Sequence, residues 1–173
     1  MPERHLRNAS ATTFGIEIRS AFMNYPNWNQ KLESSLNSGQ PPADKRPVVL
    51  AVDDNHDNLE LLTQILDLFG CECVGAVDGY SALSAAADRL PDLIVLDICL
   101  PDIDGIELVK RIKQNPKLIN IPIVAVTALA KTEDRDRILE AGCIGYLSKP
   151  FNIKDLEQII SHQLNHQSLL VEF

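Results

Sequence analysis

Apolar residues follow two patterns that alternate along the chain from Pro47 onward. Short runs such as VVLAV, LIVLD and IPIVAV have no polar alternation, which is typical of strands covered on both faces. Longer segments between them carry apolar residues at helical spacing, as Leu59, Leu62, Leu66 and Phe69 do in NLELLTQILDLFG. The pattern therefore predicts strands and helices in strict alternation.

Five strand–helix units follow from this pattern. The strands are predicted at 48–52, 71–77, 92–97, 121–128 and 144–149. The helices are predicted at 58–70, 79–90, 105–116, 132–142 and 152–164. Alternating units of this kind build a parallel sheet with helices on both faces. We expect an α/β fold with a doubly wound, five-stranded parallel sheet of the flavodoxin-like type.

Charge and polarity divide the chain near residue 46. The 173 residues carry a net charge of −8, but residues 1–46 hold six Lys/Arg against four Asp/Glu. This segment ends in SGQPPADKRP, which is typical of a flexible linker. We expect an N-terminal extension and linker at 1–46, largely disordered, a folded domain at 47–165 and a tail at 166–173. Four aromatic residues leave open that the extension docks on a partner: Phe14, Phe22, Tyr25 and Trp28.

The composition argues against several classes of protein. No apolar run approaches the roughly 18 residues of a membrane span, and no basic start precedes an apolar block, so we expect a cytosolic protein. Beyond residue 46 the chain holds ten basic and twenty acidic residues, which disfavours direct nucleic-acid binding. Cysteines in the cytosol rarely form disulfides, so Cys71 and Cys73 are interpreted as apolar core residues of one strand face.

Polar residues end four of the five predicted strands. Asp53 and Asp54 follow the first strand, Asp97 ends the third, Thr127 the fourth and Lys149 the fifth. In a flavodoxin-like sheet these four strands are neighbours, and their carboxyl ends form the binding edge. The sequence thus predicts three carboxylates, a hydroxyl and an ammonium in one shallow cleft.

This set of side chains suits phosphoryl transfer to a carboxylate. Three close carboxylates repel one another unless a cation lies among them, and Mg²⁺ prefers such oxygen ligands. A carboxylate beside Mg²⁺, a lysine and a hydroxyl can accept a phosphoryl group, because the cations neutralise charge on the transferred oxygens. Asp97 is the predicted acceptor because it lies between Asp53 and Asp54 on one side and Thr127 and Lys149 on the other.

The motifs VDDN, DLIVLDICLPDIDG, IPIVAVTA and GYLSKPF, in this order over about residues 47–165, resemble the receiver domain of response regulators in two-component signalling. The resemblance implies roles for the residues at the matching positions. Asp97 would be the phosphoacceptor, Lys149 would contact the phosphoryl group, and Asp53, Asp54, Asp97 and the backbone carbonyl of Cys99 would bind Mg²⁺. Thr127 and Tyr146 would form the switch, Ala128 would leave room for the phosphoryl group, and the peptide bond before Pro150 would be cis.

The resemblance also implies a function and partners. A histidine kinase or phosphotransfer protein would phosphorylate Asp97. The surface of the fourth helix, fifth strand and fifth helix would then change and signal to a downstream protein or relay the phosphate. We expect no output domain, no membrane contact, and a monomer or weak dimer. We expect no enzymatic activity beyond the domain's own phosphorylation and dephosphorylation. An aspartate-nucleophile Mg²⁺ phosphatase and an unphosphorylated, receiver-like binding scaffold remain the alternatives.

Two positions bear on the lifetime of the phosphoryl group. In relatives the side chains two residues beyond the phosphoacceptor and two beyond the switch hydroxyl influence hydrolysis, and here they are Cys99 and Leu129. Neither can orient an attacking water as a carboxylate or an amide can. The sequence therefore predicts slow self-dephosphorylation.

Overall fold

The structure is a computed structural model that describes residues 46–128 and 132–168. Within these residues five strands alternate with five helices. The strands are β1 (Val48–Val52), β2 (Glu72–Ala76), β3 (Leu93–Asp97), β4 (Ile123–Thr127) and β5 (Gly145–Ser148). The helices are α3 (His56–Leu68), α4 (Gly79–Arg89), α5 (Gly105–Gln114), α6 (Thr132–Glu140) and α7 (Ile153–Ser168). Every predicted strand and helix of the folded part is present.

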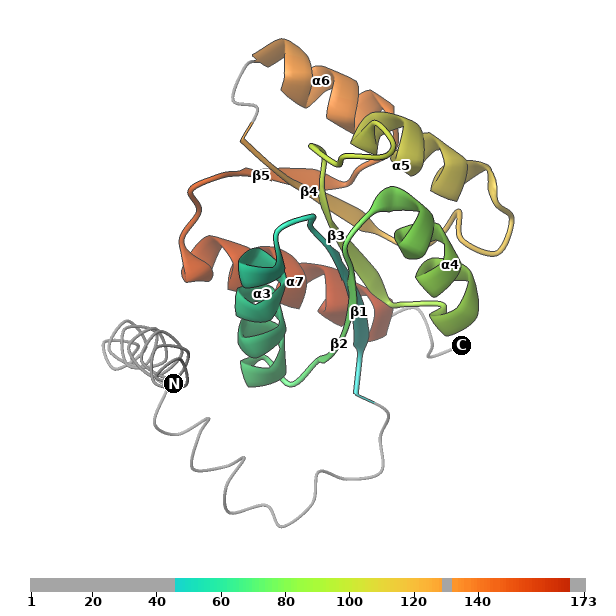
Figure 1. Ribbon diagram of the computed structural model, residues 1–173. Helices are drawn as coiled ribbons and strands as arrows, with labels where there is room; N and C mark the ends of the chain where they lie inside the picture. The colour runs from blue at the N-terminus through green and yellow to red at the C-terminus, as the bar shows by residue number, and fades with distance from the viewer. Residues whose placement is uncertain (1–45, 129–131, 169–173) are drawn as a thin grey trace, which may run out of the picture. The chain divides into compact units, whose positions relative to one another are not determined.

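The five strands form one parallel sheet in the order β2-β1-β3-β4-β5. Helices α3 and α7 cover one face, and α4, α5 and α6 cover the other (Figure 1). Two clusters of buried apolar residues fill the space between the sheet and these two helix layers. The fold is therefore the doubly wound, flavodoxin-like α/β fold that the sequence predicts.

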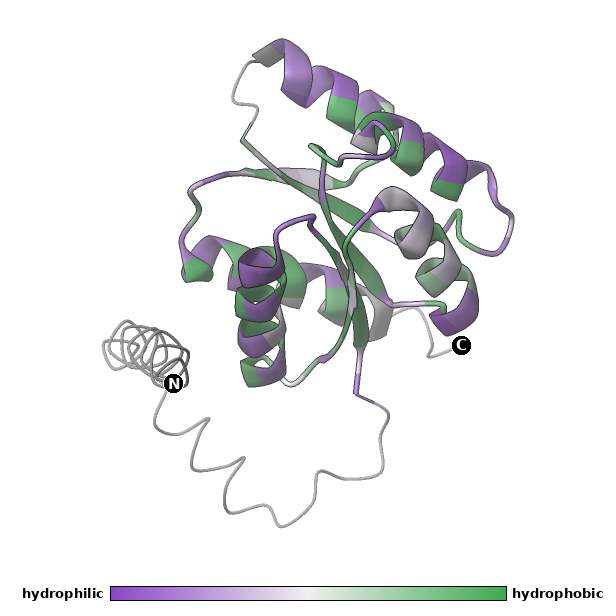
Figure 2. Cartoon of the chain, viewed as in Figure 1, coloured by the Kyte–Doolittle hydropathy of each residue, from purple (hydrophilic) through white to green (hydrophobic). Residues whose placement is uncertain are grey.

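Burial explains why the strands were recognisable in the sequence. All five residues of each of β1, β3 and β4 are buried, so these strands are apolar on both faces. The edge strands β2 and β5 are partly exposed. The helices are hydrophobic toward the sheet and hydrophilic on the outside (Figure 2). Among the described cysteines, Cys71 is buried and the half-buried Cys73 packs against the same core cluster, as expected of core thiols.

Most helix boundaries differ from the predicted ones by one or two residues, and the end of α7 differs by four. Helix α3 begins at His56, two residues earlier than predicted, because the Asn55 side chain accepts hydrogen bonds from the backbone N–H groups of Asp57 and Asn58 and caps the helix there. Helix α7 extends to Ser168, four residues beyond the predicted end. No Gly or Pro follows Leu164 to stop it.

The loop after β3 is tied to the start of α4. The Asp102 carboxylate accepts hydrogen bonds from the backbone N–H groups of Gly79 (2.9 Å) and Tyr80 (3.0 Å), which lowers the pKa of Asp102. The same loop packs tightly at its end, since a Cβ on Gly105 would lie 2.5 Å from the Ile98 Cα. These contacts fix the path of the backbone that leaves Asp97.

The folded unit begins at Arg46, whose side chain joins the start of β1 to the end of α3 through hydrogen bonds. Arg46 Nη2 lies 2.6 Å from an Asp67 carboxylate oxygen, and Arg46 Nε donates to the Gly70 carbonyl over 3.2 Å. The predicted extension and linker lie outside the described residues but for Arg46, as does most of the predicted tail, so the three-part division stays a prediction. No helix in the described ranges is both long and apolar enough to cross a membrane.

Candidate functional site

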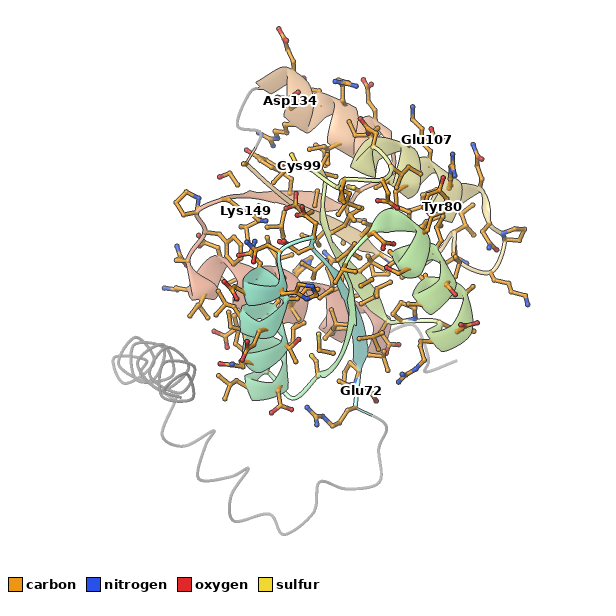
Figure 3. The ribbon with its side chains drawn as sticks, in the orientation of Figure 1. Glu72, Tyr80, Cys99, Glu107, Asp134 and Lys149 are labelled. Atoms are coloured by element: carbon orange, nitrogen blue, oxygen red, sulfur yellow. The ribbon has the colours of Figure 1, made fainter. Side chains whose placement is uncertain are left out.

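The polar residues at the strand ends meet at the carboxyl edge of the sheet. Asp53 follows β1, Asp97 and Thr127 end β3 and β4, and Lys149 follows β5. Figure 3 labels Lys149 and Cys99 near this edge and Glu72 near the opposite one. Parallel pairing brings the residues together because all these strands end in the same direction.

Lys149 bridges two buried carboxylates. Its Nζ lies 2.7 Å from Asp53 Oδ2 and 2.6 Å from Asp97 Oδ2. Asp53 is only 2% exposed and Asp97 only 7%. Burial lowers the pKa of Lys149, but the hydrogen bonds to Asp53 and Asp97 and the charges of both carboxylates outweigh this effect, so the pKa of Lys149 is raised. The ammonium is thus held charged between the acceptor predicted from the sequence and its acidic neighbour.

Asp53, Asp54 and Asp97, here called the acidic cluster, form a group suited to a cation. One carboxylate oxygen from each lies within 4.8 Å of the others. Lys149 offsets only one of the three negative charges, so the cluster keeps an excess of negative charge. Asp54 is exposed, so the cluster is open to solvent on its side. Clustered oxygen ligands with excess negative charge fit a hard divalent cation, so the acidic cluster could hold a metal ion.

Asp97 is further oriented by the loop that follows it. The backbone N–H of Cys99 donates to Asp97 Oδ1 over 2.8 Å, while Lys149 holds Oδ2. Cys99 itself is exposed. The role of its backbone carbonyl as a metal ligand stays a prediction.

Thr127 and Ala128 lie next to Lys149 at the end of β4. Thr127 is fully buried, and its carbonyl accepts a hydrogen bond of 2.8 Å from the Lys149 backbone N–H. Ala128 is exposed. The peptide bond between Lys149 and Pro150 is cis. These residues therefore lie at the same edge as the acidic cluster. Leu129, named above for the lifetime of the phosphoryl group, lies outside the described residues.

Tyr146 lies within β5, three residues before Lys149. It pairs with Ala125 of β4, is half-buried and packs against the core cluster under α4, α5 and α6. The Arg135 guanidinium of α6 lies 5.5 Å from the centroid of its ring, within the range of a cation–π interaction. Tyr146 therefore connects the sheet to α6.

One polar residue of the site, Asn58, is not predicted by the sequence pattern. Its Nδ2 lies 3.1 Å from each carboxylate oxygen of Asp53, while the backbone N–H of Asn55 donates to Asp53 Oδ1 over 2.9 Å. The pattern identifies Asn58 only as the first residue of a helix. The signal was its position one helical turn after the cap Asn55, which turns its side chain back toward the end of β1.

The comparisons with known proteins agree on one family. A model of the response regulator receiver domain matches residues 49–161. The polar-differentiation response regulator DivK of Brucella anthropi is 37% identical over 116 residues, which cover 67% of this chain and 94% of that relative.

Solved structures give the same result. Chemotaxis protein CheY4 of Vibrio cholerae superposes with a TM-score of 0.65 at 30% identity, over 68% of this chain and 98% of that one. A CheY-like receiver domain protein of Methanospirillum hungatei gives a TM-score of 0.67 at 30% identity, over 72% and 98%. The similarity spans the whole sheet and the site at its carboxyl edge.

Proposed function

This chain belongs to the response regulator receiver domain family of two-component signalling, and from that premise we propose that it is a switch controlled by phosphorylation of Asp97. The observation that carries the proposal is the Lys149 ammonium between Asp53 and Asp97, at 2.7 Å and 2.6 Å, beside the acidic cluster. A phosphoacceptor needs a cation on its carboxylate and further positive charge nearby. Lys149 would supply the nearby positive charge, and the acidic cluster offers ligands for the cation.

In the proposed reaction a carboxylate oxygen of Asp97 attacks the phosphorus of a phosphohistidine. An acyl phosphate bond forms, the bond from phosphorus to the histidine nitrogen breaks, and its electron pair stays on the imidazole of the donor. Lys149 leaves Asp97 and pairs with the new phosphoryl oxygens. The Cys99 N–H keeps the carboxylate oriented through its bond to Oδ1. The donor would be a histidine kinase or a phosphotransfer protein.

The metal of this site would be Mg²⁺. The acidic cluster and the backbone carbonyl of Cys99 would hold it, in agreement with the close carboxylate oxygens and the excess negative charge described above. When bound, Mg²⁺ would supply positive charge to neutralise the transferred phosphoryl oxygens. Asp54, exposed at the rim, would be the carboxylate that the cation meets first.

The signal would pass from the phosphoryl group to α6, β5 and α7. The Thr127 hydroxyl would turn toward the phosphoryl oxygens, for which the small Ala128 leaves room. Tyr146 would move inward behind Thr127 and change its contact with Arg135. The α6–β5–α7 surface would then bind or release a protein partner, or the phosphoryl group would pass on in a relay.

The experiment uses a small phosphodonor in place of the kinase. The full chain is incubated with acetyl phosphate and Mg²⁺, and the acyl phosphate is detected by intact mass. We expect phosphorylation of the wild type, none in Asp97→Asn, and strongly reduced phosphorylation in Asp54→Ala. A wild type that stays unmodified would favour the scaffold alternative. Steady turnover of a phosphate monoester would favour the phosphatase.

The phosphorylated form should be long-lived. The exposed Cys99 side chain, two residues beyond Asp97, cannot orient water as an amide can, and Leu129 offers no such group by its chemistry. After removal of the phosphodonor, loss of the acyl phosphate is followed by intact mass in the wild type, Cys99→Asn and Leu129→Glu. We expect slow loss in the wild type and faster loss in at least one variant. Loss within seconds from the wild type, unchanged in both variants, would refute this prediction.

A further inference from the structure

Asp53 and Asp54 adjoin in sequence but differ in how they are held. Within the described residues, the Asp53 carboxylate accepts hydrogen bonds from the Asn55 N–H, from Lys149 Nζ and, at both oxygens, from Asn58 Nδ2. For the exposed Asp54 carboxylate the described part of the chain offers no hydrogen bond or ion pair. One acid is therefore fixed in place, and the other is free to meet a cation.

The contacts of Asp53 use most of the hydrogen-bonding capacity of its carboxylate. An ionised carboxylate offers about four acceptor positions. At Asp53, which is only 2% exposed, one is used by a backbone N–H and one by an ammonium, and the Asn58 amide shares an N–H between both oxygens. The Asn58 side chain on α3 is thus the contact that reaches both oxygens at once, and a position remains for a cation.

Phosphorylation of Asp97 would remove one of these contacts. In the proposed function Lys149 turns toward the phosphoryl oxygens and gives up its bond of 2.7 Å to Asp53. Asn58 is then the one side-chain donor left on Asp53 among the described residues. A buried carboxylate that lost this donor as well would keep only the Asn55 N–H and could rotate.

We propose that Asn58 is a positioning residue that holds both oxygens of Asp53 and so keeps the acidic cluster arranged for its cation, also after Lys149 has moved. The inference rests on the proposed function, because it assumes that the acidic cluster binds Mg²⁺. Groups that orient metal-binding carboxylates typically change metal affinity about 10- to 100-fold when they are removed. Asn58 acts only through Asp53, so its effect appears in Mg²⁺ affinity rather than in the chemical step.

The test compares Mg²⁺ binding in variants of the full chain. Asn58→Leu removes the donor and keeps the branched shape of the side chain, and Asn58→Ala removes it with a residue that favours helix. Gln64→Leu is the matched control, since it removes an exposed amide of α3 whose hydrogen bond within the described residues goes to the exposed Glu60. Calorimetry gives the dissociation constant for Mg²⁺ without any phosphodonor, and the thermal midpoint reports on folding.

We expect both Asn58 variants to bind Mg²⁺ about 10-fold more weakly than the wild type and the control. Phosphorylation by acetyl phosphate should show the same shift in the Mg²⁺ midpoint, with little change in the maximal rate. Asn58→Gln, which keeps an amide, should recover part of the affinity.

A purely structural role gives a different result. Asn58→Leu and Asn58→Ala would then lower the thermal midpoint and leave Mg²⁺ affinity unchanged, which overturns the inference. If the wild type itself binds no Mg²⁺, both the proposed function and the inference about Asn58 fail. Wild-type affinity in either Asn58 variant, together with normal binding by the wild type, overturns the role of Asn58 alone.

Discussion

Two half-buried lysines lie at opposite ends of the sheet and have opposite pKa shifts. At the carboxyl edge, Lys149 lies between two carboxylates, and its pKa is raised. At the amino end of β4, Lys113 of α5 donates from Nζ to the carbonyls of Ile119 (2.9 Å) and Ile121 (2.8 Å). Burial lowers the pKa of Lys113, and the nearby Cys143 only partly opposes this effect.

The difference follows from the groups that surround each ammonium. Carbonyl groups satisfy the hydrogen bonds of Lys113 but bring no negative charge, so this lysine joins the end of α5 to the loop before β4. The carboxylates around Lys149 bring full charges, which an incoming phosphoryl group can replace. One lysine therefore holds the fold together, and the other is available for chemistry.

The strongest test of this comparison is Lys149→Met, which keeps the stem and removes the ammonium. Asp53 and Asp97 would stay buried without their shared cation, so we expect the free energy of unfolding to fall by about 3 kcal/mol in the absence of Mg²⁺. Phosphorylation by acetyl phosphate should slow by about 100-fold or more, since a donor to the developing charge is lost. Urea unfolding and intact mass measure the two effects. A variant phosphorylated at the wild-type rate would contradict the role of Lys149.

The same change at the other end of the sheet, Lys113→Met, should have a smaller effect. Two hydrogen bonds to carbonyl groups are lost, which lowers the free energy of unfolding by about 1.5 kcal/mol. The rate of phosphorylation should not change, because Lys113 lies at the opposite end of the sheet. If Lys113→Met slowed phosphorylation as much as Lys149→Met, the two ends would not differ as the structure implies.

Raising the pH above neutral should change the contributions of the two lysines to folding stability in opposite directions. This effect is smaller than that of either substitution. The raised pKa of Lys149 means that its stabilisation is fully present below the ordinary value of 10.5 and is lost as pH rises through the raised pKa. The lowered pKa of Lys113 means that a penalty on its charged form is relieved as pH rises from that pKa toward 10.5. Urea unfolding of the wild type and both Met variants at pH values from about 8 to about 11 measures how the free energy of unfolding depends on pH near both lysine pKa values. As pH rises, the stability of the wild type relative to Lys149→Met should fall, and its stability relative to Lys113→Met should rise. A change of the same sign in both comparisons would contradict this prediction.

Much of the fold could be predicted because its signals are local. The buried runs of β1, β3 and β4 are apolar on both faces, and helical spacing, Pro91 and the glycines mark the helices between them. The end of α7 could not be predicted, because residues 165–168 carry no apolar spacing and no stop signal.

The site could be predicted as far as backbone topology determines it. Strand order brings Asp53, Asp97, Thr127 and Lys149 to one edge, and these residues follow directly from the ends of the apolar runs. The bridge from Lys149 to both carboxylates and the two contacts of Asn58 depend on side-chain directions from different elements. No spacing along the sequence specifies such directions, so these contacts were not foreseen.

Asp102 makes the loop after Asp97 a spacer of fixed length. Its carboxylate caps the first N–H groups of α4, a helix that precedes the loop in the chain. Surface loops usually tolerate inserted residues, but an insertion between Asp97 and Asp102 would draw the carboxylate away from Gly79 and Tyr80. The capping box of Asp78 and Ser81 would remain, but the first two N–H groups of α4 would lose their acceptor. A loop transplanted from a relative would therefore have to bring the matching start of α4 with it.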